Sequence, residues 1–306
     1  MGARASIVYS GATAGRTAHG SAILAGVKGT LILCATPIGN LEDVSTRLRS
    51  TLEGADVVFA EDTRRTGKLM ERLGIRAELR SFFVGNEQQR LGELRERLRR
   101  GETVALVSDA GMPAVSDPGV GAVRLANEVG ATVSVVPGPS AVTSALAVAG
   151  LGGDRFVFEG FLPRGAGERV RRMEAIAADD RPTVLFSPPT RVAQDLAELA
   201  DHVGAGRPVV VARELTKLHE EVWRGTLGDA ASHWTTDVQP RGEFTLVIAP
   251  AVQTAPDMAG ALASVDERVA AGVRLSEAVR QVAETTSVSR RILYEAALEA
   301  QAARDS

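Results

Sequence analysis

The chain has 306 residues, of which 44% are hydrophobic and 24% charged, and its formal net charge is −3. This composition is typical of a globular protein of about two domains, and the charge excludes a polycation, so any nucleic-acid contact has to come from a local basic patch. The single cysteine, Cys34, excludes a disulfide or a cysteine-based metal cluster within one chain.

The first 28 residues are rich in Gly, Ala and Ser and lack the continuous apolar core of a signal peptide. We expect a disordered leader over 1–28. No stretch of about 18 apolar residues follows, so the sequence predicts no transmembrane helix, no membrane partner and a cytoplasmic protein. The four histidines are scattered through the chain and predict no metal site.

The pattern changes at Thr30, where apolar strand-like runs begin to alternate with stretches of helical spacing. Ser45 is expected to cap a helix at its start, and Gly74 and Gly101 are expected to end helices. Alternating strands and helices predict a parallel sheet, and strands apolar on both faces predict helices on both sides of it. The predicted strands are 30–36, 55–62, 103–111 and 132–138, and the predicted helices are 45–55, 66–75, 86–102, 119–130 and 140–150.

The sequence pattern changes after Gly152-Gly153, where strand-like runs dominate and only one or two helices are expected. The predicted strands are 155–162, 183–189, 208–216, 221–227 and 242–250, and the predicted helices are 167–179 and 190–203. Because the links between the last three strands are short, part of this sheet is expected to be antiparallel. The expected organisation is a leader at 1–28, an N-terminal α/β domain at 29–151, a C-terminal α/β domain at 152–253 and a helical extension at 256–306, with the domain boundary near Leu151.

Four loops follow the strands of the first domain, and all are rich in Gly, Pro or short polar residues: PIGNLED, EDTRRTG, SDAGMPAVSDPG and PGPSA. Ligands of open α/β sheets gather beyond the carboxyl ends of the strands. Ordinary turn chemistry explains any one of these loops, whereas four together favour a small-molecule pocket. A phosphate-binding GxxxxGK[ST] loop and a G-x-S-x-G nucleophile motif are absent from the sequence, and the glycine matches to a dinucleotide fingerprint are weak.

Seven motifs of the chain together resemble those of a known family. PIGNLED, AEDTRRTG, NEQQR, VSDAGMPAVSDPG, PGPSAVTSALAVAGL, FEGFLPRG and ARELTK occur in the order typical of one family. The chain resembles, over about residues 29–301, the bacterial 16S ribosomal RNA 2′-O-ribose methyltransferase I family of the tetrapyrrole methylase superfamily. The resemblance implies two α/β domains with S-adenosylmethionine in the cleft between them, a homodimer, and methyl transfer to a cytidine ribose in the decoding region of 16S ribosomal RNA in the 30S subunit.

The resemblance also implies the cofactor-binding residues. They are Pro37, Ile38 and Gly39 on one wall, Asp109, Ala110, Gly111 and Pro113 against the methionine or ribose part, Pro139, Ser140 and Ala141 on another side, and Leu162 and Ala212 from the second domain. Of the two Ser-Asp pairs in VSDAGMPAVSDPG, the first is expected to face the cofactor. The second, Ser116-Asp117, is expected to cap the following helix.

Transfer to a 2′-hydroxyl is helped by a group that accepts its proton, such as a lysine of lowered pKa or a carboxylate. The candidates are Lys217 and Glu214 in ARELTK and Glu61 and Asp62 in AEDTR. The alternative for Lys217 is a surface or domain-hinge salt bridge. Arginines can hold RNA phosphates with forked hydrogen bonds, and the candidates are Arg64, Arg65, Arg191, Arg213, Arg290 and Arg291.

Three stretches depart from the family pattern. The stretch LFSPPTR has Ser187 and Thr190 where the family usually has Glu and His, SFFVGNE lacks the usual histidines, and Met112 replaces a threonine. We infer that these positions shape RNA contact or structure rather than chemistry. They keep open a catalytically silent RNA-binding assembly factor as an alternative to the methyltransferase, and a tetrapyrrole methyltransferase is a second alternative.

The C-terminal segment SEAVRQVAETTSVSRRILYEAAL is expected to form a helix, a turn and a second helix that Arg290 and Arg291 open. Such a unit can present arginines to phosphates. The alternative is a small bundle that packs on the catalytic domains. Because the rest of the chain is not basic, we expect this unit to assist RNA binding.

Overall fold

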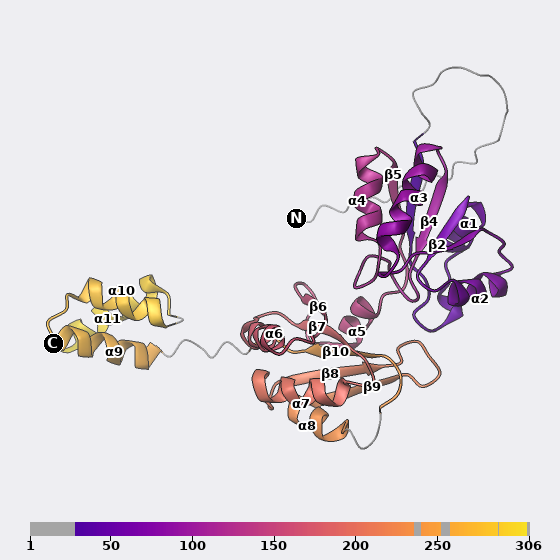
Figure 1. Cartoon of the computed structure of the whole chain (residues 1–306). Coiled ribbons are helices and arrows are strands. Elements are labelled where there is room, and N and C mark those ends of the chain that lie inside the picture. Colours follow the sequence, from indigo (N-terminus) through magenta and orange to yellow (C-terminus); the bar gives the residue numbers. More distant parts are fainter. Residues whose placement is uncertain (1–27, 236–239, 252–257, 287, 305–306) are drawn as a thin grey trace, which may run out of the picture. The chain divides into compact units, whose positions relative to one another are not determined.

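The computed structural model describes residues 28–235, 240–251, 258–286 and 288–304, so the expected leader lies outside the described residues except for Lys28. The N-terminal sheet has five parallel strands in the order β3-β2-β4-β1-β5 (Figure 1). They are β1 (Thr30–Cys34), β2 (Val57–Ala60), β3 (Leu79–Ser81), β4 (Thr103–Val107) and β5 (Thr132–Val136). The parallel sheet is confirmed, and β3 is an addition too short to produce a sequence signal.

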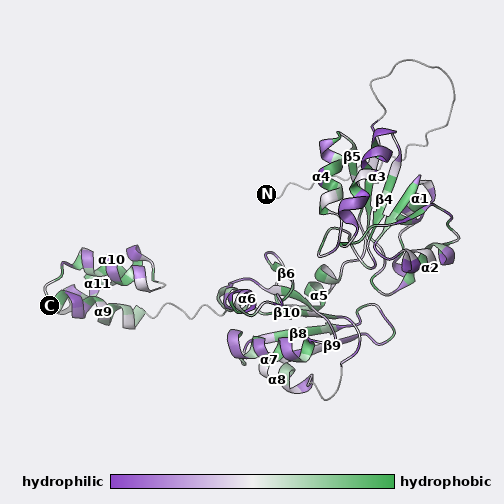
Figure 2. Ribbon diagram, viewed as in Figure 1, coloured by the Kyte–Doolittle hydropathy of each residue, from purple (hydrophilic) through white to green (hydrophobic). Residues whose placement is uncertain are grey.

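Helices cover both faces of this sheet because successive strand residues point to opposite sides. In β2, Val57 and Phe59 pack with α3 and α4, whereas Val58 and Ala60 pack with α1 and α2. Figure 2 shows these strands mainly in green, the colour of hydrophobic residues. Cys34 belongs to the second of these cores, and burial raises the pKa of its thiol to about 12. The helices are α1 (Thr46–Gly54), α2 (Thr63–Leu73), α3 (Glu87–Arg99) and α4 (Val120–Glu128).

Most of the expected helix ends are confirmed. The Ser45 hydroxyl accepts a hydrogen bond from the Leu48 N–H at 3.0 Å, and Gly74 ends α2 with φ +68°. At the end of α3 the capping residue is Arg100, and Gly101 follows it at φ +81°. The expectation that Asp117 caps α4 is wrong. The capping residue there is Gly119, and no side chain of the pair before it caps the helix.

The second sheet is mixed, with the order β6-β7-β10-β8-β9. Only β6 and β7 pair in parallel, and the other neighbours are antiparallel, as the short links predict. Helices α6, α7 and α8 build one core on this sheet, and α5 contacts β7 and β10. The elements are α5 (Ala141–Ala149), β6 (Val157–Phe161), α6 (Ala166–Ala178), β7 (Thr183–Ser187), α7 (Val192–Val203), β8 (Pro208–Arg213), β9 (Glu221–Thr226), α8 (Leu227–His233) and β10 (Phe244–Ile248).

The two sheets belong to two compact units whose sequence boundaries interleave. Among the described residues, the first unit contains those up to Thr36 and Asp43–Gly138, and the second contains Pro37–Glu42 and those from Pro139 onward. The division at Gly138–Pro139 precedes the boundary expected near Leu151, because α5 packs on strands of the second sheet. The segment Pro37–Glu42, which follows β1, reaches the second unit although its strand lies in the first.

The C-terminal helices α9 (Met258–Ala270), α10 (Leu275–Thr285) and α11 (Arg290–Arg304) share an apolar core of their own. Val265, Val279, Val282 and Leu293 are buried at its centre. The two predicted helices are therefore present as α10 and α11, with α9 packed against both. Within the described residues, no helix is long and apolar enough to cross a membrane.

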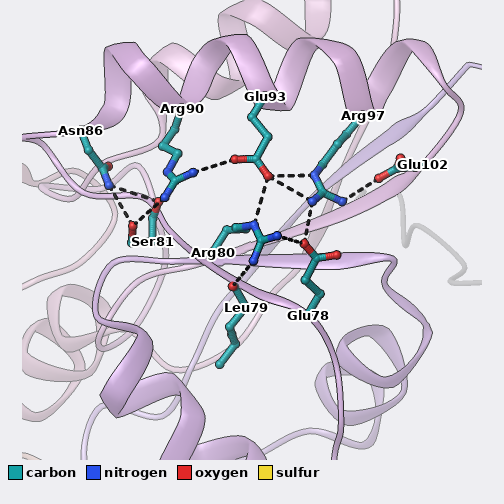
Figure 3. A network of polar contacts seen from close by, with 9 residues as sticks. All are labelled: Glu78, Leu79, Arg80, Ser81, Asn86, Arg90, Glu93, Arg97 and Glu102. Carbon is teal, nitrogen blue, oxygen red and sulfur yellow. Dashed lines mark hydrogen bonds and ion pairs between the residues drawn. The ribbon is translucent and has the colours of Figure 1, made fainter.

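An ion-pair network fastens α3 to the edge of the first sheet (Figure 3). Glu93 accepts hydrogen bonds from Arg90 at 2.8 Å, Arg97 at 3.1 Å and Arg80 of β3 at 3.3 Å. Arg97, only 12% exposed, also pairs with Glu78 and Glu102. Several charges shared in this way fix geometry better than an isolated surface pair does.

Candidate active site

The first and third strand-end loops of the first unit are joined by backbone hydrogen bonds. The Thr36 N–H donates to the Gly111 carbonyl at 2.9 Å, and the Gly111 N–H donates back to Thr36 at 3.1 Å. The Thr36 hydroxyl donates to the Ser108 carbonyl at 3.2 Å. These contacts fix the start of the loop 108–119, in which Asp109, Ala110, Gly111 and Pro113 are the predicted cofactor contacts.

The second and third loops meet through carboxylates. Asp109 accepts a hydrogen bond from the Asp62 N–H at 3.0 Å and pairs with Arg65 at 3.3 Å, and its own N–H donates to Glu61 at 3.3 Å. The Asp62 side chain caps α2, and its two oxygens accept hydrogen bonds from Nε and Nη2 of Arg64. The structure thus brings together five residues that the sequence singled out from EDTRR and SDAG, within the first unit.

The pKa values of the carboxyl groups in this cluster differ in direction. Hydrogen bonds from Arg64 hold the pKa of Asp62 well below its ordinary value. Burial raises the pKa of Glu61, although the Asp109 N–H and Arg65 oppose the rise. Burial raises the pKa of Asp117 to about 6 against a hydrogen bond from Ser108, and the nearby Glu61 and Asp109 carboxylates add to it. Asp117, expected to be a helix cap, is therefore a member of this cluster.

The Asp117→Asn variant is expected to flatten the pH dependence of stability. Because the pKa of Asp117 rises from 3.8 to about 6 on folding, the folded state holds a proton that the unfolded state has released, and the free energy of unfolding falls as pH rises between these values. After allowance for solvent screening, the wild-type protein should lose on the order of 1 kcal/mol of unfolding free energy over this pH range, and the Asp117→Asn variant should not. Urea unfolding followed by circular dichroism at pH 4 and pH 7 measures it. Equal pH slopes for both proteins would contradict it.

A second cluster surrounds Lys217 in the second unit. Its ammonium group donates to Glu214 at 2.7 Å and to Glu243 at 3.0 Å, and the Glu243 N–H donates to the same Glu214 oxygen at 2.9 Å. Burial lowers the pKa of Lys217, but the hydrogen bonds to Glu214 and Glu243 outweigh it and leave the pKa raised. Burial raises the pKa of Glu214, but Lys217 outweighs this and lowers it. The lysine is therefore held as a cation.

The backbone around Lys217 is closely packed and partly strained. Glu214 and Thr216 have φ +51° and +66°, a region that residues with a Cβ rarely adopt. A Cβ added to Gly39 would lie 2.3 Å from Lys217 Cγ and 2.9 Å from Thr216 Oγ1. The loop PIGN therefore lies directly against ELTK, and glycine at position 39 is required for this approach.

The hydroxyl of Thr216 is a buried polar atom without a hydrogen-bond partner among the described residues. Such groups are rare in folded proteins, because burying an unpaired hydroxyl costs free energy. An orphan hydroxyl between Gly39 and Lys217 fits a ligand that brings its own polar groups. The predicted cofactor wall Pro37, Ile38 and Gly39 belongs to this second-unit cluster, as does the predicted catalytic pair Glu214 and Lys217.

The remaining predicted cofactor residues lie in the second unit as well. Ser140 is the N-cap residue of α5, yet its side chain makes no capping hydrogen bond. Leu162 and Ala212 are buried, 4% and 1% exposed, with Leu162 in the core under α6 and α7 and Ala212 in β8. Pro139 and Ala141 flank Ser140 at the start of α5.

The predicted RNA-binding arginines differ in their surroundings. Arg64 and Arg65 have 86% and 65% of their side chains exposed. Arg213 is engaged by the Arg241 carbonyl at 2.7 Å and by Glu221 at 3.2 Å, and Arg191 lies 3.7 Å from Asp195. Arg290 and Arg291 open α11, where Arg291 pairs with Glu295.

Ser187, one of the departures from the family pattern, belongs to a buried network. Its hydroxyl donates to Asp195 at 2.6 Å, and Asp195 pairs with Arg169 at 2.7 Å, while Arg169 also pairs with Glu198. The other departure, Thr190, is exposed. The sequence drew attention to Ser187, but it carried no signal for the partners Asp195 and Arg169, nor for Glu243 beside Lys217, because these contacts link distant segments.

Comparisons with known proteins agree with this architecture. The family model for tetrapyrrole (corrin/porphyrin) methylases matches residues 30–231. Ribosomal RNA small subunit methyltransferase I of Synechocystis is 42% identical over 277 residues, which cover 90% of this chain and 99% of that protein. The protein of the same name from Thermotoga maritima is 45% identical over 220 residues, 72% of this chain and 98% of that protein.

Solved structures show the same fold at low identity. A cobalt precorrin-4 methyltransferase has a TM-score of 0.54 and 21% identity, covering 72% of this chain and 94% of that one. A uroporphyrin-III C-methyltransferase from Thermus thermophilus, solved with S-adenosylhomocysteine, has a TM-score of 0.52 and 19% identity, covering 72% of this chain and 97% of that one.

Proposed function

This chain belongs to the ribosomal RNA small subunit methyltransferase I family of tetrapyrrole methylases, and from this premise we propose that it is a 2′-O-methyltransferase. It transfers a methyl group from S-adenosylmethionine to the 2′-hydroxyl of a cytidine in the decoding region of 16S ribosomal RNA. The observation that carries the proposal is the 42% identity to the Synechocystis protein over 99% of that protein's length. The enzyme acts as a cytoplasmic homodimer on the 30S subunit.

S-adenosylmethionine supplies an electrophilic methyl group on a sulfonium that leaves as a neutral thioether. The chain's own residues bind and orient it, so that positioning supplies much of the acceleration. Gly39 allows the loop PIGN to lie closely against Thr216 and Lys217. The Thr216 hydroxyl, which lacks a hydrogen-bond partner among the described residues, offers a polar partner for the ligand. Asp109, anchored by Asp62 and Arg65, offers a fixed carboxylate in the first unit. The proposed cofactor contacts are 109–113 in the first unit, and 37–39, 139–141, Leu162 and Ala212 in the second.

Among the four candidate catalytic groups, Glu61 is the best proton acceptor. A general base works best when its pKa lies near the operating pH, and burial raises the pKa of Glu61. Asp62 and Glu214 have lowered pKa values and hold Arg64 and Lys217, which makes both poor bases. Lys217 stays protonated and stabilises the negative charge that develops on the ribose oxygen.

The proposed RNA contacts are arginines from several parts of the chain. Arg64 and Arg65 are mostly exposed beside Asp62 and Asp109 and keep free guanidinium donors for phosphate. Arg191 and Arg213 are engaged by protein partners, so we give them a smaller share of phosphate contact. Arg290 and Arg291 at the start of α11 add a second region of positive charge.

Deleting residues 256–306 is expected to weaken binding to 30S subunits while leaving the affinity for S-adenosylmethionine unchanged. The deleted helices α9, α10 and α11 share a core of their own, so their removal leaves the cores of both sheets intact. Filter binding to 30S and calorimetry with the cofactor measure the two affinities. The Arg290→Ala/Arg291→Ala double variant should reproduce part of the loss. Unchanged 30S affinity of the truncated protein would refute the assignment.

One experiment separates the proposed function from its alternatives. The protein is incubated with labelled S-adenosylmethionine and 30S subunits that lack the modification, and the label is mapped by the nuclease resistance that 2′-O-methylation confers. We expect label at a cytidine ribose of 16S RNA. Label transferred only to a precorrin-like substrate in a parallel incubation indicates a tetrapyrrole methyltransferase. Binding to 30S without any transfer indicates a silent assembly factor.

A further inference from the structure

We propose that Glu87, the first residue of α3, is a positioning residue that holds the loop 108–119 in place by capping α4 from a different helix. This loop carries Pro113, so the inference rests on the proposed function, in which Pro113 contacts the cofactor. Glu87 itself touches no reacting atom. It acts through the start of α4.

The contact is a hydrogen bond between helices. The Gly121 N–H in the first turn of α4 donates to Glu87 Oε1 at 3.2 Å. The first N–H groups of a helix have no partner within the helix, and a carboxylate near them is favoured by the helix dipole. The N-cap residue of α4 is Gly119, which has no side chain to serve them, and Ser116 and Asp117 leave them uncapped. Glu87 takes the place of the missing local cap.

Gly121 makes this approach possible. A Cβ added there would lie 2.6 Å from Glu87 Oε1, closer than real side chains come to one another. Glu87 and Gly121 are therefore a matched pair from the motifs NEQQR and SDPGVG, which the sequence shows separately. Neither motif predicts the other's contact.

Glu87 is held at a fixed position because the turn before α3 is itself hydrogen-bonded. The Phe83 N–H donates to Asn86 Oδ1 at 2.8 Å, and Asn86 Nδ2 donates to the Ser81 hydroxyl at 3.0 Å. Arg90 donates to the same hydroxyl and to Glu93 (Figure 3). The start of α3 is thus joined to the end of β3, and Glu87 extends from it towards α4.

The loop needs anchors at both ends because its interior is strained. Ala114 and Ser116 have φ +67° and +63°, a region that is sparsely populated by residues with a Cβ. Such conformations persist only where the surroundings over-determine them. The hydrogen bonds between Thr36 and Gly111 hold one end, and the contact of Glu87 with Gly121 holds the other. Loss of the second anchor lets the end of the loop relax and displaces Pro113, whereas Asp109 keeps its contacts with Asp62 and Arg65.

The test compares full-length Glu87→Ala with Glu87→Gln, which keeps an acceptor oxygen. Calorimetry with S-adenosylhomocysteine should give about tenfold weaker binding for the alanine variant and binding close to wild type for the glutamine variant. The KM for 30S subunits should stay unchanged, because the loop, not the RNA surface, is displaced. Glu96→Ala is the matched control, since Glu96 also lies on α3 but its side chain pairs with the exposed Arg99 at 3.5 Å.

A double-mutant cycle with Gly121→Ala makes the test independent of folding losses in one variant. Gly121→Ala should weaken S-adenosylhomocysteine binding in the wild type, because the methyl group displaces the Glu87 carboxylate. In the Glu87→Ala background it should have little effect. Hydrogen exchange of the α4 amides should accelerate in both single variants, which a purely global loss of stability would not confine to α4.

The outcomes are distinguishable. If Glu87→Ala accelerates exchange at α4 but binds S-adenosylhomocysteine as wild type does, the positioning role is wrong. Additive effects of the two substitutions would also overturn it. If the wild-type protein binds no S-adenosylhomocysteine, the proposed function fails instead.

Discussion

Replacing Lys217 by alanine is expected to lower kcat for methylation of 30S subunits by about 10²–10³-fold, the size of effect seen when one preorganised group is removed from a developing oxyanion. Lys217 is held as a cation by Glu214 at 2.7 Å and Glu243 at 3.0 Å. Its charge is therefore present before the substrate arrives. The affinity for S-adenosylmethionine should change far less than kcat, because the variant keeps Gly39 and Thr216.

The control for this prediction is Lys28→Ala. Lys28 precedes β1 and lies near Gly130, so it stands at the amino ends of the strands rather than near the loops that follow them. The Lys28→Ala variant should methylate 30S subunits at the wild-type rate. Single-turnover kinetics separates chemistry from product release. If the Lys217→Ala variant has an unchanged single-turnover rate, Lys217 has no role in the chemical step and serves only in a salt bridge.

The largest loss of stability is expected for Asp195→Ala, at about 3–5 kcal/mol, the range for breaking a buried ion pair from one side. The side chains of Asp195 and Arg169 are only 3% and 6% exposed. Without Asp195, Arg169 keeps Glu198 as its single acidic partner among the described residues and a long hydrogen bond to the Pro163 carbonyl, and the Ser187 hydroxyl loses its acceptor. Urea unfolding followed by tryptophan fluorescence measures the effect, because both tryptophans of the chain, Trp223 and Trp234, lie in the second unit with this network.

Two variants calibrate this result. Ser187→Ala removes a single hydrogen bond to a carboxylate, so it should cost about 1.5–3 kcal/mol. Asp201→Ala changes an exposed carboxylate of the same helix α7 and should stay within about 0.5 kcal/mol of wild type. An Asp195→Ala protein as stable as Asp201→Ala would show that the pair contributes no net stability.

The sequence predicted best where a local pattern decides the structure. Alternating apolar runs predicted the parallel sheet, and Ser45 and Gly74 marked helix ends through their own chemistry. It failed at Asp117, where an apparent cap before Pro118-Gly119 joins a carboxylate cluster instead. The reason is not local, because the cap of α4 comes from Glu87, 34 residues earlier in the chain.

The candidate site shows the same contrast. Lys217 and Glu214 were predicted from one motif, but the raised pKa of Lys217 has a second contribution from Glu243, which comes after the next strand. Likewise, the importance of Gly39 was expected from its loop, whereas its contact with Lys217 requires two segments that only the fold brings together. Motif reasoning identifies residue types, and tertiary contacts set their protonation states.

The interleaved boundary of the two units has a consequence for synthesis on the ribosome. Pro37–Glu42 leaves the ribosome early, yet its packing partners belong to the segment from Pro139 onward. The first unit can complete its parallel sheet once Val136 has emerged, whereas the second has to recruit a hexapeptide already attached to a folded neighbour. Domains of nascent chains generally fold as units from the N-terminus, so here the order of emergence fixes the order of assembly. Of the residues synthesised before Gly138, the segment Pro37–Glu42, which lies against Lys217, is therefore the last to reach its folded position.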